Sequence, residues 1–171
     1  MARPDPLLSP GAICGGGLVT LITVGTQFFD SLLQEADRLA GLGRLPGPVR
    51  AQIGTSRFEP HHMSWFRFCR GLREQFQQAD LVIAHGGTGT VCELIEAQVP
   101  FIAVVNHAKA GDHQLEFLED LSALYDLCWI RSPAELADAI PAARPARRRG
   151  QPGVESLAGA VRDSLLGAPG R

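Results

Sequence analysis

Cysteine is scarce in this chain, and its placement argues against two kinds of site. The four cysteines, Cys14, Cys69, Cys92 and Cys128, are far apart in a sequence of 171 residues, and no two of them form a Cys-x-x-Cys pair. This spacing disfavours both a zinc site and a disulfide framework. We therefore expect reduced thiols, as in a cytoplasmic protein.

Long apolar runs and an excess of charge of either sign are absent too. The start of the chain lacks the basic and apolar segments of a secretion signal, and no stretch reaches the roughly 20 apolar residues of a membrane-spanning helix. A net charge of −2 argues against electrostatic binding of nucleic acid. With 45% hydrophobic and 20% charged residues, the composition is that of one globular domain with a real core.

One stretch, residues 79–93, carries the strongest pattern in the chain. Residues 81–84 form a short apolar run that is typical of a parallel strand covered on both faces. Gly86, Gly87 and Gly89 follow, and they let the backbone turn sharply and approach a ligand. The helix predicted next would offer free N–H groups and the positive end of its dipole to an anion. This order predicts a phosphate-binding turn, although glycine runs also end strands without any binding role.

Strands and helices alternate along the rest of the chain. The predicted strands are residues 18–24, 49–53, 81–84, 101–105 and 127–130. The predicted helices are residues 28–39, 64–79, 91–97, 112–122 and 133–140. This alternation implies right-handed crossovers, and hence an α/β fold with a single Rossmann-like parallel sheet flanked by helices.

The composition changes at both ends of this predicted domain, residues 18–140. Residues 1–17 are rich in proline and glycine and are predicted to be a flexible leader. Residues 141–153 are predicted to be a linker of alanine, proline and arginine, whose arginines could touch anionic lipids but are more simply solvated. Residues 154–166 predict a C-terminal amphipathic helix that docks on its own domain or on a partner, before a tail at 167–171.

A pair of histidines, His61 and His62, raises the question of a metal site. No third ligand stands at a recognisable spacing, so we expect no metal there. The pair lies in the irregular segment 55–63, which suggests loop residues at the edge of a cleft.

Three motifs occur in an order that resembles a known family. Residues 23–30 read Thr-Val-Gly-Thr-Gln-Phe-Phe-Asp, residues 79–93 hold the glycine turn, and residues 111–114 read Gly-Asp-His-Gln. Together they resemble the C-terminal, donor-binding half of glycosyltransferase family 28, over about residues 18–140. That half occurs within a peptidoglycan enzyme. It also occurs as a separate chain in the two-subunit dolichol-linked N-acetylglucosaminyltransferase of eukaryotes and in bacterial exopolysaccharide glycosyltransferases.

The resemblance implies a UDP-sugar site at the carboxyl ends of the strands, in a domain like the C-terminal half of a GT-B glycosyltransferase. Gly25 and Thr26 would lie near the diphosphate, and Glu93 would accept hydrogen bonds from the ribose hydroxyls. The second lip of the nucleotide site would consist of His85, Gly86, Gly87, Thr88, Gly89 and Thr90. Asp112 and Gln114 would face the donor sugar or its phosphates.

Several of these residues also fit purely structural roles. Thr90 and Glu93 match the Ser/Thr-x-x-Glu pattern of a capping box, in which Glu93 would bond to its own helix terminus. Asp112 could be the N-cap of the helix predicted there. His85 is more often a turn residue bonded to backbone than a catalyst, and the role of His113 stays open.

The family implies an inverting reaction in which an acceptor hydroxyl attacks the anomeric carbon and UDP leaves. Such a reaction needs a base and charge stabilisation for the leaving diphosphate. We expect this chain to supply only the second, through helix N-termini and glycine-turn amides, with no cofactor and no metal, since the sequence has no Asp-x-Asp cluster. A membrane-anchored partner subunit would bring the lipid-linked acceptor and the base. The chain would then be cytoplasmic and peripheral at the inner face of the membrane, in polysaccharide or glycolipid synthesis.

Two alternatives come from other classes of protein. One is a non-catalytic subunit that binds a partner but no nucleotide. The other is a nicotinamide-dependent oxidoreductase, which should carry Gly-x-Gly-x-x-Gly after its first strand and an acidic residue at the end of its second. Here the first turn contains Gly25, Thr26 and Gln27, and the second strand ends at Ile53 and Gly54, which fits poorly.

Overall fold

The computed structural model describes residues 18–108 and 113–149, and a parallel sheet runs through them. Its order is β3-β2-β1-β4-β5-β7, with every neighbouring pair parallel. The bounds are β1 (Thr20–Thr23), β2 (Val49–Gln52), β3 (Ser64–Phe66), β4 (Leu81–His85), β5 (Phe101–Val104) and β7 (Cys128–Ile130). The predicted α/β fold with one Rossmann-like parallel sheet is confirmed.

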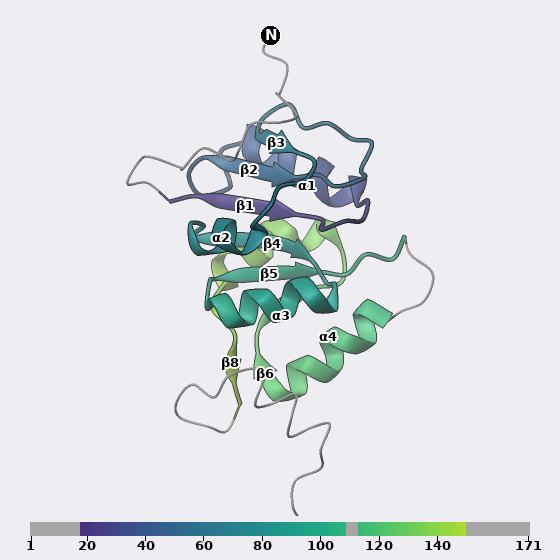
Figure 1. The fold of residues 1–171 in the computed structure, drawn as a ribbon, viewed down its shortest axis with the longest axis vertical. Helices are drawn as coiled ribbons and strands as arrows, with labels where there is room; N and C mark the ends of the chain where they lie inside the picture. Colours follow the sequence, from purple (N-terminus) through teal and green to yellow (C-terminus); the bar gives the residue numbers. More distant parts are fainter. Residues whose placement is uncertain (1–17, 109–112, 150–171) are drawn as a thin grey trace, which may run out of the picture.

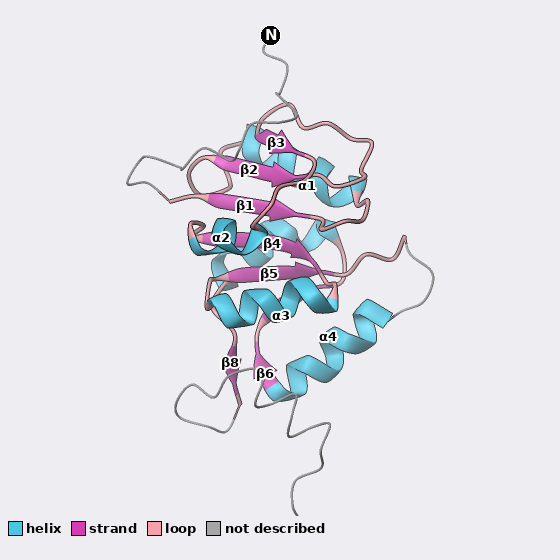
Figure 2. Ribbon diagram, viewed as in Figure 1, coloured by secondary structure: helices cyan, strands magenta, loops and turns pink. Residues whose placement is uncertain are grey.

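Helices cover both faces of this sheet (Figures 1 and 2). On one face α1 (Asp30–Gly41) and α5 (Leu136–Ala139) pack against a row of isoleucines, Ile22, Ile83 and Ile102, which the strand register aligns. On the other face α2 (Leu72–Gln77), α3 (Thr88–Ala97) and α4 (His113–Leu124) pack against Leu21, Val82 and Phe101. Both faces are apolar because each is covered, as in most parallel sheets.

The strand order reverses between β1 and β4, which are neighbours in the sheet. The chain leaves β1 toward α1 on one face and leaves β4 toward α3 on the other. Open α/β sheets bind ligands in the crevice at this point, outside the carboxyl ends of the strands. The labelled strands of the sheet run from left to right in Figure 1, so this carboxyl edge is on the right.

One predicted helix, residues 64–79, is wrong over its first half. Residues 64–66 form the edge strand β3, in which Trp65 aligns with Ala51 and Phe66 with Gln52. The helix begins only at Leu72, after Gly71, whose φ of 74° belongs to the left-handed region. The apolar residues had a helical spacing, but pairing with β2 decides the structure of this aromatic segment.

The segment that follows the last helices returns to the domain. The predicted helix 133–140 appears as α5 between two 3₁₀ turns, Pro133–Glu135 and Ile140–Ala142. Beyond it, β8 (Arg147–Arg148) pairs antiparallel with β6 (Tyr125–Asp126). Residues 144–149 of the predicted linker thus lie against the domain. The predicted leader, C-terminal helix and tail lie outside the described residues.

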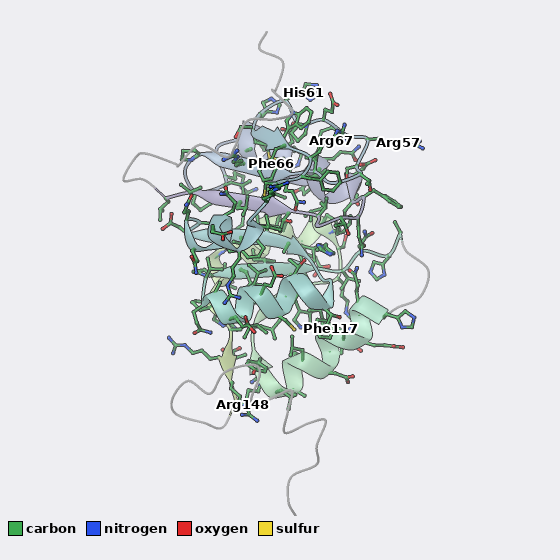
Figure 3. The ribbon with its side chains drawn as sticks, viewed as in Figure 1. Arg57, His61, Phe66, Arg67, Phe117 and Arg148 are labelled. Carbon is green, nitrogen blue, oxygen red and sulfur yellow. The ribbon has the colours of Figure 1, made fainter. Side chains whose placement is uncertain are left out.

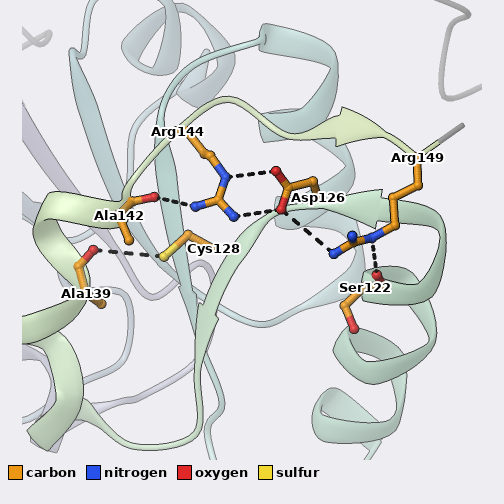
Figure 4. Close-up of polar contacts among 7 residues, drawn as sticks. All are labelled: Ser122, Asp126, Cys128, Ala139, Ala142, Arg144 and Arg149. Carbon is orange, nitrogen blue, oxygen red and sulfur yellow. Dashed lines mark hydrogen bonds and ion pairs between the residues drawn. The ribbon is translucent and has the colours of Figure 1, made fainter. Parts of the chain in front are cut away.

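Ion pairs and hydrogen bonds hold residues 144–149 against the domain (Figure 4). Arg144 donates to both carboxylate oxygens of Asp126, from Nε at 3.1 Å and from Nη2 at 2.6 Å. Arg149 donates from Nε to the carbonyl of Ser122 at 2.9 Å, and its backbone N–H bonds to Leu124 at 2.8 Å. The hydrogen bond from Arg144 lowers the pKa of Asp126 below its ordinary value of 3.8.

Candidate functional site

The turn between β1 and α1, residues 24–29, is the first element of the site. Gly25 has a φ of 64°, a conformation that favours glycine. The N–H of Gly25 donates to the Thr23 hydroxyl at 3.1 Å, and its carbonyl accepts from Nε2 of Gln52 at 3.0 Å. The buried Gln52 therefore ties the turn to β2, while Thr26 at its tip is exposed.

The turn between β4 and α3 is the second element. Gly86 is buried at the end of β4, and Gly87 is the N-cap of α3, with an extended backbone and no side-chain cap. The first hydrogen bond of the helix runs from the N–H of Val91 to the carbonyl of Gly87. The N–H groups of Thr88, Gly89 and Thr90 precede it and are the donors that an uncapped helix offers to an anion.

His85 joins these two turns. The residue is 5% exposed, and a Cβ built on Gly25 would lie 2.6 Å from Cε1 of its imidazole. A Cβ built on Gly87 would overlap its Nε2 atom. Both residues are glycines because the ring fills the space between them, so His85 acts here as a packing residue that sets the distance between the turns.

The N-terminus of α4 closes the site on its third side. A Cβ on Gly86 would lie 2.7 Å from Cδ1 of Leu118 and 3.4 Å from Oε1 of Gln114, so this glycine permits α4 to approach. Oε1 of Gln114 accepts the backbone N–H of Asn106 at 3.0 Å. Since the oxygen is used in this way, the NH₂ group of Gln114 is the part of the amide that remains for a ligand.

Glu93 lies in the second turn of α3 and is exposed. The alternative of a capping box is wrong, because the helix begins at Thr88 and places Thr90 inside its first turn rather than at its N-cap. Glu93 is four residues after Gly89, so the two share one face of the helix. Among described residues the carboxylate has no hydrogen bond or ion pair, and it is available to a ligand.

The three residues before Gln114 in the motif 111–114 have different outcomes. Asp112 and Gly111 lie outside the described residues, so the donor-facing and N-cap roles of Asp112 stay predictions. The side chain of His113 is 86% exposed, and its Nδ1 atom is 3.7 Å from the Glu116 carboxylate, one turn along α4.

A pocket of about 310 Å³ adjoins the β1–α1 turn. Phe28 and Asp30 line it from the end of that turn, and Thr55 and Arg57 line it from the loop after β2. The carboxylate of Asp30 accepts the N–H of Arg57 at 2.9 Å, which joins the two walls. Arg57 projects on the carboxyl side of the sheet, whereas Arg148 lies at the far end of the molecule (Figure 3).

The sequence of this chain places it in a known family. Residues 19–144 match the model of the glycosyltransferase family 28 C-terminal domain. The chain belongs to this family.

Individual family 28 relatives are similar over parts of their length. UDP-N-acetylglucosamine transferase subunit ALG13 of Homo sapiens is 34% identical over 113 residues, which cover 58% of this chain and 10% of the relative. The protein of the same name in Yarrowia lipolytica is 29% identical over 117 residues, which cover 61% of this chain and 60% of the relative. The pyrophosphoryl-undecaprenol N-acetylglucosamine transferase of Opitutus terrae is 32% identical over 76 residues, which cover 44% of this chain and 20% of the relative. The matched segment thus spans a tenth to three fifths of these relatives.

Solved glycosyltransferases share the fold of this family 28 domain. MurG of Acinetobacter baumannii superposes with a TM-score of 0.57 at 18% identity, covering 75% of this chain and 41% of that one. The glycosyltransferase of kitacinnamycin gives a TM-score of 0.56 at 19% identity, covering 83% and 38%. The expected likeness to one half of a GT-B glycosyltransferase is confirmed at the level of the fold.

The histidine pair of the family 28 domain lies away from this site. The carboxylate of Asp37, which is 5% exposed, accepts the N–H groups of His61 and His62 at 2.9 and 2.7 Å and contacts Nδ1 of His62 at 2.9 Å. The ring of His62 packs on Gly41, the last residue of α1, so the pair lies toward the amino ends of the strands and not at the carboxyl edge. In the part of the chain that the structure describes, no three His, Cys, Asp or Glu residues are placed to hold a metal ion.

Two further observations concern thiols and membranes. Cys69, Cys92 and Cys128 are free, and burial raises the pKa of each thiol. None of the helices within residues 18–108 and 113–149 is long and apolar enough to cross a membrane.

The residues that hold the site together escaped the sequence analysis. Asn106 is 3% exposed and donates from Nδ2 to the carbonyl of Phe28 at 2.9 Å, which ties the end of β5 to the β1–α1 turn. Gln52 ties the end of β2 to the same turn, through its bond to the carbonyl of Gly25. Both are polar residues near the carboxyl end of a strand, where a parallel sheet gathers its binding residues, but nothing nearby in the sequence marks their partners.

Proposed function

We propose that this chain is the donor-binding subunit of an inverting glycosyltransferase that moves a sugar from a UDP-sugar to a lipid-linked acceptor. One observation carries the proposal: two glycine turns meet at the switch point of the sheet, held at a fixed distance by His85 between Gly25 and Gly87. The N–H groups that are open at these turns would bind the two phosphates. Family 28 membership, and relatives named as UDP-N-acetylglucosamine transferases, point to a UDP-sugar as the ligand.

Each group of the site has a role in this proposal. The N–H groups of Thr88 and Gly89 would bind the diphosphate and stabilise the charge that develops on UDP as it leaves. Glu93 would accept hydrogen bonds from the ribose hydroxyls, since an ionised carboxylate is an acceptor only. The NH₂ of Gln114 would donate to an oxygen of the sugar or its phosphates.

The acceptor and the catalytic base would come from a second polypeptide. Several relatives carry the word subunit in their names, and the matched GT-B enzymes are more than twice as long as the part that this chain covers. A membrane-anchored partner that binds the acceptor would keep this chain at the cytoplasmic face of the membrane. The product would belong to polysaccharide, exopolysaccharide or glycolipid synthesis.

Calorimetry with UDP, a panel of UDP-sugars and NADH tests the donor site. We expect UDP to bind and NADH not to bind, and Glu93→Ala to weaken UDP binding by about tenfold, the equivalent of about 1.4 kcal/mol. Glu96→Ala is the matched control, because Glu96 is on the same helix but its carboxylate pairs with Arg73 at 3.3 Å. Wild-type protein that binds NADH, or neither nucleotide, would refute the donor site.

A transfer assay tests the need for a partner. The chain is co-purified with its native partner and supplied with UDP-sugars and lipid-linked acceptors, and its rate is compared with that of the isolated chain. Transfer should require both polypeptides. Full activity of the isolated chain would contradict the two-subunit arrangement while leaving the donor site intact.

A further inference from the structure

The carbonyl groups of the β1–α1 turn are held by hydrogen bonds from three directions. The carbonyl of Gly25 accepts from Nε2 of Gln52 at 3.0 Å. The carbonyl of Gln27 accepts the N–H of Thr55 at 3.1 Å, and that of Phe28 accepts from Nδ2 of Asn106 at 2.9 Å. Three acceptors of the turn are thus bound to the body of the domain.

The N–H groups of the same turn are divided, because those of Gly25, Gln27 and Phe29 donate hydrogen bonds within the domain. Within the described chain, the N–H groups of Thr26 and Phe28 have no hydrogen-bond partner, and both residues are exposed. The N–H groups of Asp30 and Ser31, in the first turn of α1, cannot bond within the helix. Open N–H groups beside carbonyls that are already bound favour an anion, because carbonyl oxygens repel a phosphate.

The two side-chain amides are buried and their orientation is defined. Gln52 is 4% exposed, and its Oε1 atom accepts from the Thr23 hydroxyl. Asn106 is 3% exposed, and its Oδ1 atom accepts the N–H of Ala108 at 3.1 Å. Since each oxygen has a donor, each NH₂ group is the end that faces the turn.

We propose that Gln52 and Asn106 are positioning residues for the diphosphate. Gln52 binds the carbonyl of Gly25 and so fixes the peptide plane that carries the N–H of Thr26. Asn106 binds the carbonyl of Phe28, which keeps that oxygen away from the phosphates and anchors the residue whose own N–H is open. Neither side chain touches the ligand. This inference rests on the proposed function, since it assigns the turn to the phosphates of a UDP-sugar.

The test uses variants of similar shape that lack the donor, Gln52→Met and Asn106→Leu, in the full chain. The matched control is Thr20→Val, because Thr20 is fully buried and its hydroxyl donates to the carbonyl of Pro46 at 2.7 Å, at the amino edge of the sheet. All three variants lose one hydrogen bond to a loop carbonyl, and the two amide variants also lose the bond that their side-chain oxygen accepts. Asn106→Ala serves as a second variant if leucine disturbs folding.

Binding of UDP and of uridine separates a positioning role from general loss of structure. We expect each amide variant to weaken UDP binding by about three- to tenfold, the effect of one hydrogen bond, and to leave uridine binding unchanged. Thr20→Val should change neither. Equal losses for UDP and uridine, or no loss in either amide variant, would overturn the inference.

Amide hydrogen exchange gives a readout that needs no ligand. The N–H of Phe29, which bonds to the Ser56 hydroxyl at 2.9 Å, and the N–H of Thr55 report on the turn. Both should exchange faster in the amide variants and at the wild-type rate in Thr20→Val. If wild-type protein binds no UDP, the proposed function falls, and unchanged exchange at these amides would separately overturn the positioning role.

Discussion

Replacing Gly89 by alanine should stabilise the free protein and weaken its binding of UDP. A Cβ at this position meets no atom within 4 Å, so packing does not require a glycine. Gly89 lies in the first turn of α3, where alanine is the better helix former. We expect a gain of about 0.5 kcal/mol in the free energy of unfolding, and about a tenfold loss in UDP affinity because the new methyl group separates the backbone from the phosphate.

Gly87→Ala is the matched variant for this prediction, two residues earlier in the same turn. Its backbone, with φ of −74° and ψ of 135°, suits alanine, but its Cβ would overlap Nε2 of His85. Overfilling a packed interior costs about 1–3 kcal/mol, so this variant should lose stability as well as UDP affinity. Alanine should therefore raise the free energy of unfolding at position 89 and lower it at position 87.

Urea unfolding of the three proteins measures stability, and calorimetry with UDP measures affinity. A stabilised Gly89→Ala variant that binds UDP as tightly as the wild type would refute the reasoning, since the ligand would then not approach this backbone. A destabilised Gly89→Ala variant would show that the position is not open.

Three further predictions concern single interactions. Glu93→Gln should weaken UDP binding by about tenfold. The variant and the wild type should bind 2′,3′-dideoxy-UDP equally well, because that ligand has no ribose hydroxyl for Glu93 to bind. An equal loss of affinity on both ligands would contradict contact with the ribose. Asp37→Ala should lower the free energy of unfolding by about 2 kcal/mol in urea titrations, because it leaves two loop N–H groups without an acceptor. The control is Glu35→Ala, which removes a partly exposed ion pair with Arg38 and should cost less than about 1 kcal/mol. The pKa of Asp126 is lowered by Arg144, so their ion pair contributes above the ordinary carboxyl pKa of 3.8 and is lost as the pH falls through the lower folded value. NMR of the β8 amides during acid titration should show this release, which Asp126→Asn should reproduce at neutral pH, and a β8 signal unaffected by either change would contradict it.

The glycine turns could be predicted because their signals are local. A strand, a glycine and a helix follow one another within a few residues at both Gly25 and Gly87, and each signal depends on neighbours in the sequence. The same holds for the alternation of strands and helices that predicts a parallel sheet. Asn106 and Gln52 gave no comparable signal, because their partners in the β1–α1 turn are 78 and 27 residues away.

The wrong prediction, a helix from residue 64, also arises because the deciding partner is distant in the sequence. Phe66 fits either a helical face or a strand, and the choice depends on whether a neighbouring strand offers free backbone groups. The outer edge of β2 does so. The capping box at Thr90 failed for a related reason, since the start of α3 is set by where β4 ends.

By itself, the sequence determined the fold class, the two glycine turns and membership of glycosyltransferase family 28, because these depend on short patterns and their order along the chain. Only the tertiary structure decided what surrounds the turns: His85 between Gly25 and Gly87, Gln114 against Gly86, and two buried amides on the carbonyls of the first turn. The physical reason is that a parallel sheet gathers the carboxyl ends of strands that are distant in sequence. Contacts between those ends leave no periodic trace in the chain.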